Sequence, residues 1–305
     1  MTATILEIEF PAAQQRIVGR LHLPDQQPAA AIVTTGPLTS VKEQVCSNYA
    51  VEMAQRGFAV LTFDHRHFGA SEGEPRQLES PSRKIADIQA AADWLNSRSA
   101  VAGCPIFGMG ICAGAGYMVR AAAGSSAFRG IVTVAGYFPD ADATRRGMGE
   151  KFELAFEAAR ASEARFLKTG DAEFIPSVGL DNPNVAMPLR DAYEYYSNPS
   201  RGAVPTYVNR MALQSRVETL TFDSQSAAGE IDVPFLLVHA EKALAPGFAR
   251  QFFERVESAK SSIWLDAPKQ TAFYDDPAII NRVGDECAIF VGGTLDGTGL
   301  KSLKT

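Results

Sequence analysis

The sequence predicts an α/β fold in which a mostly parallel, doubly wound sheet carries an inserted helical cap. Short, uninterrupted apolar runs alternate with stretches of helical periodicity, a pattern typical of parallel strands covered by helices on both faces. The alternation stops at residue 137 and resumes at residue 233. An excursion of this kind usually covers the carboxyl ends of the strands, so we expect a ligand site there.

The predicted elements follow one another in a regular order. Residues 5–10 and 16–24 alternate as a half-buried antiparallel strand pair does. Further strands are expected at residues 29–36, 58–64, 105–111, 128–135, 233–240 and 261–266. Helices are expected at residues 42–56, 81–96, 113–123, 246–256 and 281–291.

The chain divides into four predicted parts. Residues 1–136 and 233–292 form two halves of one core, residues 137–232 form the helical cap, and residues 293–305 form a flexible tail. A chain of 305 residues with 46% hydrophobic residues can bury a core of this size. A separate helical domain is the alternative for 137–232, but the sheet needs the returning strands to cover its edge.

Composition excludes several classes of protein. A net charge of −6 argues against a basic face built for nucleic acid. No segment reaches the roughly 20 apolar residues of a membrane span, and the N-terminus does not resemble a signal peptide. The four cysteines show no metal-binding or disulfide spacing: Cys46, Cys104, Cys112 and Cys287. We therefore expect a cytoplasmic protein with no metal and no other cofactor.

The sharpest motif is Gly-Ile-Cys-Ala-Gly at residues 110–114, between an apolar strand and a helix of small residues. A nucleophile held in a sharp strand-to-helix turn forces the residues two before and two after it together, so they must be small. Cys112 would stand at a helix N-terminus, where the dipole favours thiolate and the N–H of Ala113 faces a developing oxyanion. The alternative is a buried, inert cysteine, which we expect for the other three.

Several separated stretches then indicate a family. Residues 36–44, 63–76, 110–117, 192–196 and 272–275 resemble the dienelactone-hydrolase-like branch of the α/β-hydrolase superfamily, whose nucleophile elbow carries cysteine. The resemblance extends from about residue 16 to residue 291. It implies an α/β-hydrolase fold and acyl transfer from an ester, lactone or thioester, with a histidine that activates the nucleophile. It also implies a second oxyanion N–H from Leu38, or from a neighbour of Pro37, beside Ala113.

The chain departs from this family at the histidine. The family has Gly-x-x-His before Phe/Leu-Tyr-Asp, whereas Gln270 occupies the histidine position here. An amide has no useful proton affinity near neutral pH, so Gln270 cannot be the general base. The acid position is also altered, because the alignment places Ala243 or Leu244 there and Glu241 is the nearest carboxylate in the loop.

These considerations give a predicted site. The catalytic candidates are Cys112, Gln270, Glu241 and His239. The oxyanion-hole candidates are Ala113, Leu38 and Pro37, and the pocket candidates are Ile111, Tyr137, His65 and Tyr274. His239 and His65 are included because each lies at the carboxyl end of a predicted strand.

Three explanations of Gln270 stay open at this point. Position 270 carries an engineered substitution that traps a substrate, or Cys112 works as a thiolate without a base, or the pocket binds a metabolite. In the third case the protein promotes a cyclisation, elimination or isomerisation, or it is a binding protein without catalytic activity. Loss of the acid together with the base favours a naturally altered site. The leading hypothesis is a cysteine-centred enzyme acting on a small or medium ester, lactone or thioester. Its expected partner is a small-molecule acyl substrate, free or carrier-bound, and a homodimer is left open.

Overall fold

The computed structural model describes residues 4–182 and 184–298. Eight strands form one sheet in the order β1-β2-β4-β3-β5-β6-β9-β10. β1 and β2 pair antiparallel, β2 and β4 pair antiparallel, and every other neighbouring pair is parallel. The strands are β1 (Thr4–Ala12), β2 (Gln15–Leu23), β3 (Ala31–Thr35), β4 (Ala59–Phe63), β5 (Ile106–Ile111), β6 (Gly130–Val134), β9 (Phe235–His239) and β10 (Lys260–Trp264).

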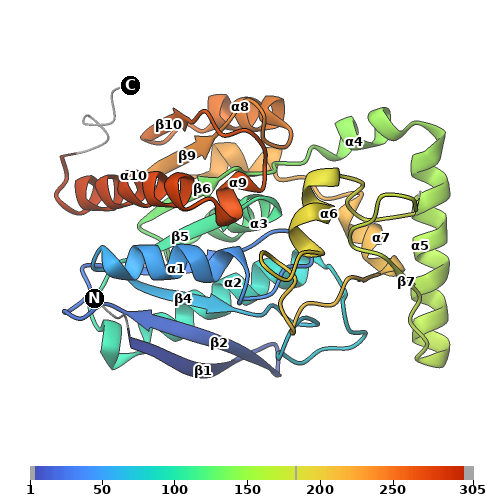
Figure 1. Cartoon of the computed structure of the whole chain (residues 1–305), viewed down its shortest axis with the longest axis horizontal. Helices are drawn as coiled ribbons and strands as arrows, with labels where there is room; N and C mark the ends of the chain where they lie inside the picture. The colour runs from blue at the N-terminus through green and yellow to red at the C-terminus, as the bar shows by residue number, and fades with distance from the viewer. Residues whose placement is uncertain (1–3, 183, 299–305) are drawn as a thin grey trace.

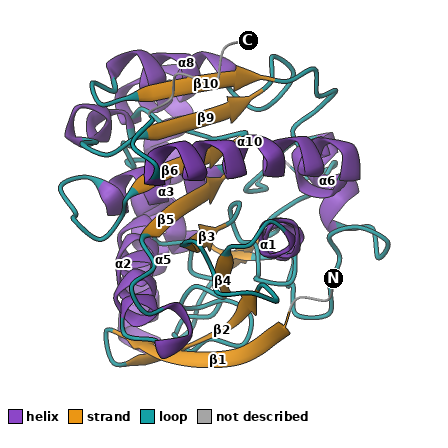
Figure 2. Ribbon diagram, turned by 90° about the vertical axis from the view of Figure 1, so that its left-hand side faces the viewer, coloured by secondary structure: helices purple, strands orange, loops and turns teal. Residues whose placement is uncertain are grey.

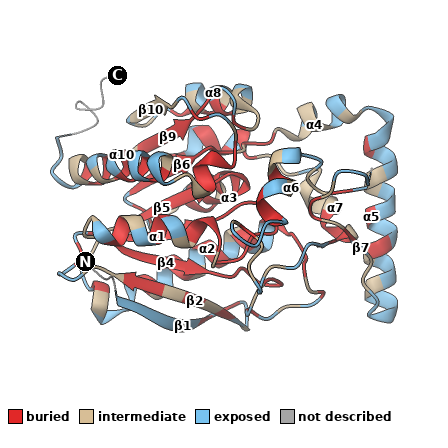
Figure 3. Ribbon diagram, viewed as in Figure 1, coloured by how far each residue is buried: buried red, intermediate tan, exposed pale blue. Residues whose placement is uncertain are grey.

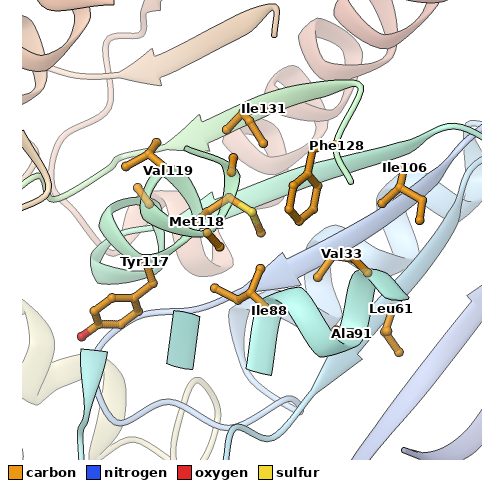
Figure 4. Close-up of a cluster of buried hydrophobic side chains, with 14 of the residues drawn as sticks. Val33, Leu61, Ile88, Ala91, Ile106, Tyr117, Met118, Val119, Phe128 and Ile131 are labelled. Atoms are coloured by element: carbon orange, nitrogen blue, oxygen red, sulfur yellow. The ribbon is translucent and has the colours of Figure 1, made fainter. Parts of the chain in front are cut away.

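Helices cover both faces of this sheet (Figures 1 and 2). One face carries α1 (Val45–Gln55), α9 (Ala272–Asp275) and α10 (Pro277–Leu295), and the other carries α2 (Pro81–Asn96), α3 (Ala113–Ala122) and α8 (Pro246–Arg255). Each face has its own buried apolar cluster. Figure 4 shows part of the second cluster, where Ile88 of α2 and Met118 of α3 lie beside Val33 of β3.

The chain between β6 and β9 leaves the sheet; we call residues 137–232 the excursion. It contains the helices α4 (Ala141–Met148), α5 (Glu150–Thr169), α6 (Arg190–Tyr196) and α7 (Arg216–Thr219), and the strands β7 (Phe174–Ile175) and β8 (Met211–Ala212). The two strands have two residues each and pair only with one another, so they add nothing to the main sheet. α5 lies at the far end of the molecule, with most of its surface exposed (Figures 1 and 3).

Element boundaries differ from the sequence prediction in three instructive places. α1 begins at Val45 rather than at 42, because both the backbone N–H and the ammonium of Lys42 donate to Asp64, each at 2.8 Å. α10 begins at Pro277 rather than at 281, because the Asp276 side chain caps it by accepting from the N–H of Ala278. The predicted tail is helical as far as Leu295, and residues 299–305 lie outside the described residues.

The described residues bear on two further expectations. Each of the four cysteines is free. No helix within residues 4–182 and 184–298 combines the length and the apolar character that a bilayer crossing requires.

Candidate active site

The turn after β5 holds Cys112 in a strained backbone conformation. Its φ is +55° and its ψ is −122°, a region that residues other than glycine rarely adopt. Three backbone hydrogen bonds maintain it. The N–H of Cys112 donates to Val134 O at 3.1 Å, and its carbonyl accepts from Tyr137 N–H at 2.8 Å and from Ala115 N–H at 3.0 Å. The tight strand-to-helix turn predicted at residues 110–114 is therefore present.

Crowding around this turn explains its two glycines. A Cβ added at Gly110 would lie 2.6 Å from the Cα of Ala115, and one added at Gly114 would lie 2.4 Å from the carbonyl oxygen of Thr35. Both neighbouring atoms belong to the backbone and cannot move aside. The turn can form only because these positions have no side chain.

A cavity of about 310 Å³ opens above the turn. Core residues, most of them in or just after the loops that follow β3, β5, β9 and β10, form one part of its wall. Residues of the excursion form the other part, which we call the roof. The lining is mostly apolar and consists of Leu38, Pro81, Cys112, Ala113, Tyr117, Tyr137, Pro139, Ala186, Met187, Pro188, Leu189, Asp191, Ala192, Tyr196, Thr219, Phe222, Leu244, Gln270, Thr271 and Tyr274. A mainly apolar enclosure with a few polar groups is the usual form of a small-molecule site.

The sulfur of Cys112 lies among three hydrogen-bond donors. Burial raises the pKa of Cys112, while hydrogen bonds from the Tyr274 hydroxyl, the Ala113 N–H and the Gln270 side chain oppose that rise. The net pKa shift is upward. The expected lowering of this pKa by the helix dipole is thus outweighed by desolvation, because the side chain is only 6% exposed.

Gln270 has every polar atom of its side chain engaged. Its Oε1 accepts from the N–H of Leu244 at 2.8 Å, and its Nε2 donates to the carbonyl of Ala135 at 2.9 Å and to the hydroxyl oxygen of Tyr274 at 3.2 Å. Because the hydroxyl oxygen of Tyr274 accepts from the Gln270 amide, the hydroxyl can donate its own hydrogen to the sulfur of Cys112. The two side chains therefore orient a donor toward Cys112.

Some of the oxyanion-hole and pocket candidates line the cavity and others do not. Leu38, Ala113, Tyr137 and Tyr274 line the cavity together with Cys112 and Gln270. Pro37 is not part of the lining, and its carbonyl accepts from Ser40, whose hydroxyl lies 2.8 Å away. Ile111 is fully buried within the core, since alternate side chains of a strand point to opposite faces.

The remaining candidates, His239, Glu241 and His65, do not reach the cavity. The ring nitrogens of His239 face the carbonyls of Ala240 and Gly136, at 3.0 and 3.2 Å. Glu241 points outward and forms an exposed ion pair with Arg250. His65 is held in the core, with its Nε2 2.9 Å from the Thr35 hydroxyl and its Nδ1 3.3 Å from the Asp87 carboxylate.

Burial lowers the pKa of both His239 and His65, so each is neutral near pH 7. In the part of the chain that the structure describes, no histidine lines the cavity.

Apart from Tyr137, the predicted site residues did not include the roof of the cavity. Tyr196, Met187 and Asp191 come from the excursion, and Asp191 accepts from the N–H of Thr271 at 2.9 Å. The signals near them were the family-like stretch at residues 192–196 and its cluster of tyrosines, which at helical spacing more often indicates plain core. They could not show which tyrosine faces the cavity, because the excursion has no regular periodicity to fix the direction of its side chains.

The sheet order, the strained turn and the cavity above it are those of an α/β hydrolase. The chain belongs to the family described as "Serine aminopeptidase, S33", whose model matches residues 26–267. This family lies within the α/β-hydrolase superfamily of hydrolases and acyltransferases.

Two curated relatives align over most of the chain. YcjY of Escherichia coli, described as an uncharacterized protein, is 30% identical over 275 residues, which cover 87% of this chain and 89% of the relative. The polyketide transferase grgF of a Penicillium species is 24% identical over 293 residues, which cover 92% and 96% of the two chains.

Solved structures agree on the fold. The crystal structure of the hypothetical protein PA2218 from Pseudomonas aeruginosa superimposes with a TM-score of 0.85 at 25% identity, covering 96% of this chain and 94% of that one. The dienelactone hydrolase of Anabaena variabilis gives a TM-score of 0.58 at 12% identity, with 94% and 96% coverage. That distant likeness shows the common fold alone, so the membership shown is of the superfamily rather than of the dienelactone-hydrolase branch.

Proposed function

We propose that this protein processes acyl thioesters, with Cys112 as a nucleophile that works without a general base. One observation carries the proposal. Cys112 and Ala113 line the same apolar cavity, while position 270, where the sequence resemblance implies a histidine, holds a glutamine whose side-chain oxygen and nitrogen both make hydrogen bonds.

The missing base makes a thioester the most suitable substrate. In thiol–thioester exchange the attacking Cys112 loses a proton and the leaving thiolate gains one, so atoms and charge balance without a third group. Thiolates are good leaving groups, whereas an alkoxide needs an acid that neither Gln270 nor the high-pKa phenol of Tyr274 supplies readily. Simple esters and lactones, also expected from the sequence, are therefore poorer substrates.

The loop after β3 supports an oxyanion hole. We assign the developing negative charge to the N–H groups of Ala113 and Leu38, which border the same cavity. Thr39 follows Leu38 with a φ of +58°, and its N–H donates to the buried Glu79 carboxylate at 2.8 Å. This bond fixes the loop, so the donors need not reorganise during the reaction.

The absence of a general base also decides where the acyl group goes after it has bound to Cys112. Water is a weak nucleophile without a base to activate it, so we propose transfer of the acyl group from Cys112 to a thiol or amine rather than rapid hydrolysis. The excursion then acts as the cap that encloses the acyl chain. A relative named polyketide transferase is consistent with an acyl-transfer role.

A mass measurement tests this proposal. Octanoyl-N-acetylcysteamine is incubated with the protein, and the intact mass and peptide map are recorded. We expect one octanoyl adduct on Cys112, absent in Cys112→Ala and retained in Cys46→Ala, whose thiol is buried away from the cavity. No adduct on Cys112, or an adduct that persists in Cys112→Ala, would contradict the proposal.

The raised pKa of Cys112 favours one competing function. A site in which the thiol stays protonated could bind a metabolite and promote a cyclisation, elimination or isomerisation without an acyl-enzyme. Its distinguishing result is native activity, or ligand binding alone, that survives Cys112→Ala.

A further inference from the structure

The roof of the cavity contains a buried hydroxyl with no hydrogen-bond partner. Tyr196, the last residue of α6, lines the cavity and is 3% exposed. Within the described residues, its hydroxyl oxygen is buried and makes no hydrogen bond. A buried polar group without a partner costs free energy and is uncommon, so it calls for a functional explanation.

The other buried hydroxyls and amides of the lining are already committed. The Tyr117 hydroxyl donates to the buried carboxylate of Glu79 at 2.8 Å, and Tyr274 accepts from Gln270 at 3.2 Å. The backbone N–H of Thr271 donates to Asp191 at 2.9 Å. Tyr196 thus differs from these groups, because it borders the cavity while its hydroxyl makes no hydrogen bond to any described residue.

The ring of Tyr196 is fixed by its neighbours. It stacks on Tyr207 with centroids 4.9 Å apart, and it meets Tyr195 edge to face at 4.9 Å. Burial raises the pKa of Tyr196 well above its ordinary value, so the phenol keeps its proton. The result is a fixed phenol with an unused donor, on a residue that borders an apolar cavity.

We infer that Tyr196 recognises an oxygen atom on the acyl chain, so that the preferred substrate is a hydroxylated or oxo-substituted medium-length acyl thioester rather than a saturated one. This inference rests on the proposed function for the thioester and extends it to the chain. A hydrocarbon chain would leave the hydroxyl of Tyr196 unpaired, whereas a chain oxygen would accept a hydrogen bond from it.

The volume sets the length of the chain. A cavity of about 150 Å³ holds one benzene ring. The cavity of about 310 Å³ is roughly twice as large, so by the same comparison it has room for an acyl group of up to about twelve carbons.

Binding to a protein without the nucleophile separates recognition from chemistry. In the Cys112→Ala background, calorimetry compares the N-acetylcysteamine thioesters of octanoate, β-hydroxyoctanoate and δ-hydroxyoctanoate. We expect at least one hydroxylated chain to bind about fivefold to tenfold more tightly than octanoyl, the effect of one neutral hydrogen bond. Adding Tyr196→Phe should bring that ratio to about one by weakening only the hydroxylated ligand.

Tyr207→Phe is the matched control. Tyr207 also has a buried hydroxyl without a partner and packs on the same ring, but it does not line the cavity. Its removal should leave the ratio unchanged. Equal binding of all three chains, or a preference that survives Tyr196→Phe, would overturn the inference.

The two proposals fail in different experiments. If Cys112 of the unmodified protein takes no acyl group while Tyr196→Phe still abolishes the preference, recognition by Tyr196 stands and the proposed function falls. If hydroxylated and plain chains acylate Cys112 equally, both in the unmodified protein and in Tyr196→Phe, the proposed function stands and recognition by Tyr196 falls.

Discussion

The side-chain oxygen of Gln270 accepts a hydrogen bond from the backbone N–H of Leu244 across 2.8 Å. In the family that the sequence resembles, position 270 holds the histidine and the region of Leu244 holds the acid. Here a main-chain donor faces position 270 where an accepting carboxylate would be needed. The site is therefore organised around the Gln270 amide, and the predicted replacements of the acid and of the base fall at two positions that contact each other.

We expect Gln270→His alone to leave ester hydrolysis within about threefold of the parent protein. A histidine there would accept from the Leu244 N–H through one ring nitrogen, which places the proton on the other nitrogen. That tautomer donates toward Cys112 and cannot take its proton. Turnover of p-nitrophenyl acetate measures the effect, and a gain of a hundredfold from this change alone would show that the amide of Leu244 does not set the tautomer.

The double variant Gln270→His with Leu244→Asp supplies the missing carboxylate. Leu244 lines the cavity beside Gln270, so an aspartate there can accept from the imidazole and orient it as a base. We expect turnover to rise on the order of a hundredfold, the usual contribution of a general base. Leu244→Asp by itself is the control and should give no gain.

Alkylation of Cys112 should keep rising with pH through the range in which an ordinary thiol levels off. Burial raises the pKa of Cys112 above its ordinary value of 9.0, so the thiolate fraction grows about tenfold per pH unit up to about pH 9. Iodoacetamide rates followed by peptide mass give the profile. A plateau below about pH 8 would mean that the thiol is activated rather than suppressed by its surroundings.

Tyr274→Phe should move this profile to still higher pH. The Tyr274 hydroxyl lowers the pKa of Cys112 by a hydrogen bond, and its removal leaves the thiolate less stabilised. We expect alkylation near neutral pH to slow by about threefold to tenfold, the effect of losing one such bond to a charged group. Tyr137→Phe, which lines the same cavity without this hydrogen bond, should leave the profile in place.

Cys112→Ser distinguishes a thiolate mechanism from a hidden base. A serine hydroxyl ionises far less readily than a thiol, so without a general base the variant should acylate at least about a hundredfold more slowly. Octanoyl-N-acetylcysteamine and intact-mass kinetics give the rate. Retention of a tenth of the parent rate would indicate that an unrecognised group removes the proton.

His22 should make the fold sensitive to acid. It is fully buried on β2, neither ring nitrogen has a partner among the described residues, and burial followed by the nearby charge of Arg20 lowers its pKa from 6.5 to about 4. The unfolded chain therefore takes up this proton first, and stability is lost as pH falls from 6.5 toward 4.

His22→Leu measures that contribution. The variant should lose about 2 kcal/mol less unfolding free energy than the parent between about pH 7 and about pH 4.5. Denaturant unfolding at both pH values gives the difference. Equal losses in the two proteins would mean that His22 is not kept neutral by the fold.

Much of the fold could be predicted because its determinants are local. Strands buried on both faces need continuous apolar runs, and α2 was predicted with the bounds that the structure shows. The turn at Cys112 was predictable for a steric reason, since Gly110 and Gly114 have no room for a Cβ. Boundaries failed where a distant or capping side chain intervened, as Asp64 does at Lys42.

The site was predicted only in part. The sequence placed Cys112, Gln270 and Tyr274 together through the family pattern, and it included His239 and Glu241 because they follow a strand end. Whether each of these residues belongs to the site depends on the direction in which its side chain points. The ring of His239 turns to backbone carbonyls and Glu241 turns to solvent, and neither choice leaves a mark in the local sequence.

The sequence by itself determined the layered sheet and the strained turn, and its resemblance to a known family predicted that Gln270 replaces a histidine. Each depends on residues that are close along the chain or on a recurrent pattern. Tertiary structure decided the rest. It paired Gln270 with Leu244, 26 residues away, and brought Tyr196 from the excursion over Cys112. Such contacts depend on how separate elements pack, which no local pattern of residues encodes.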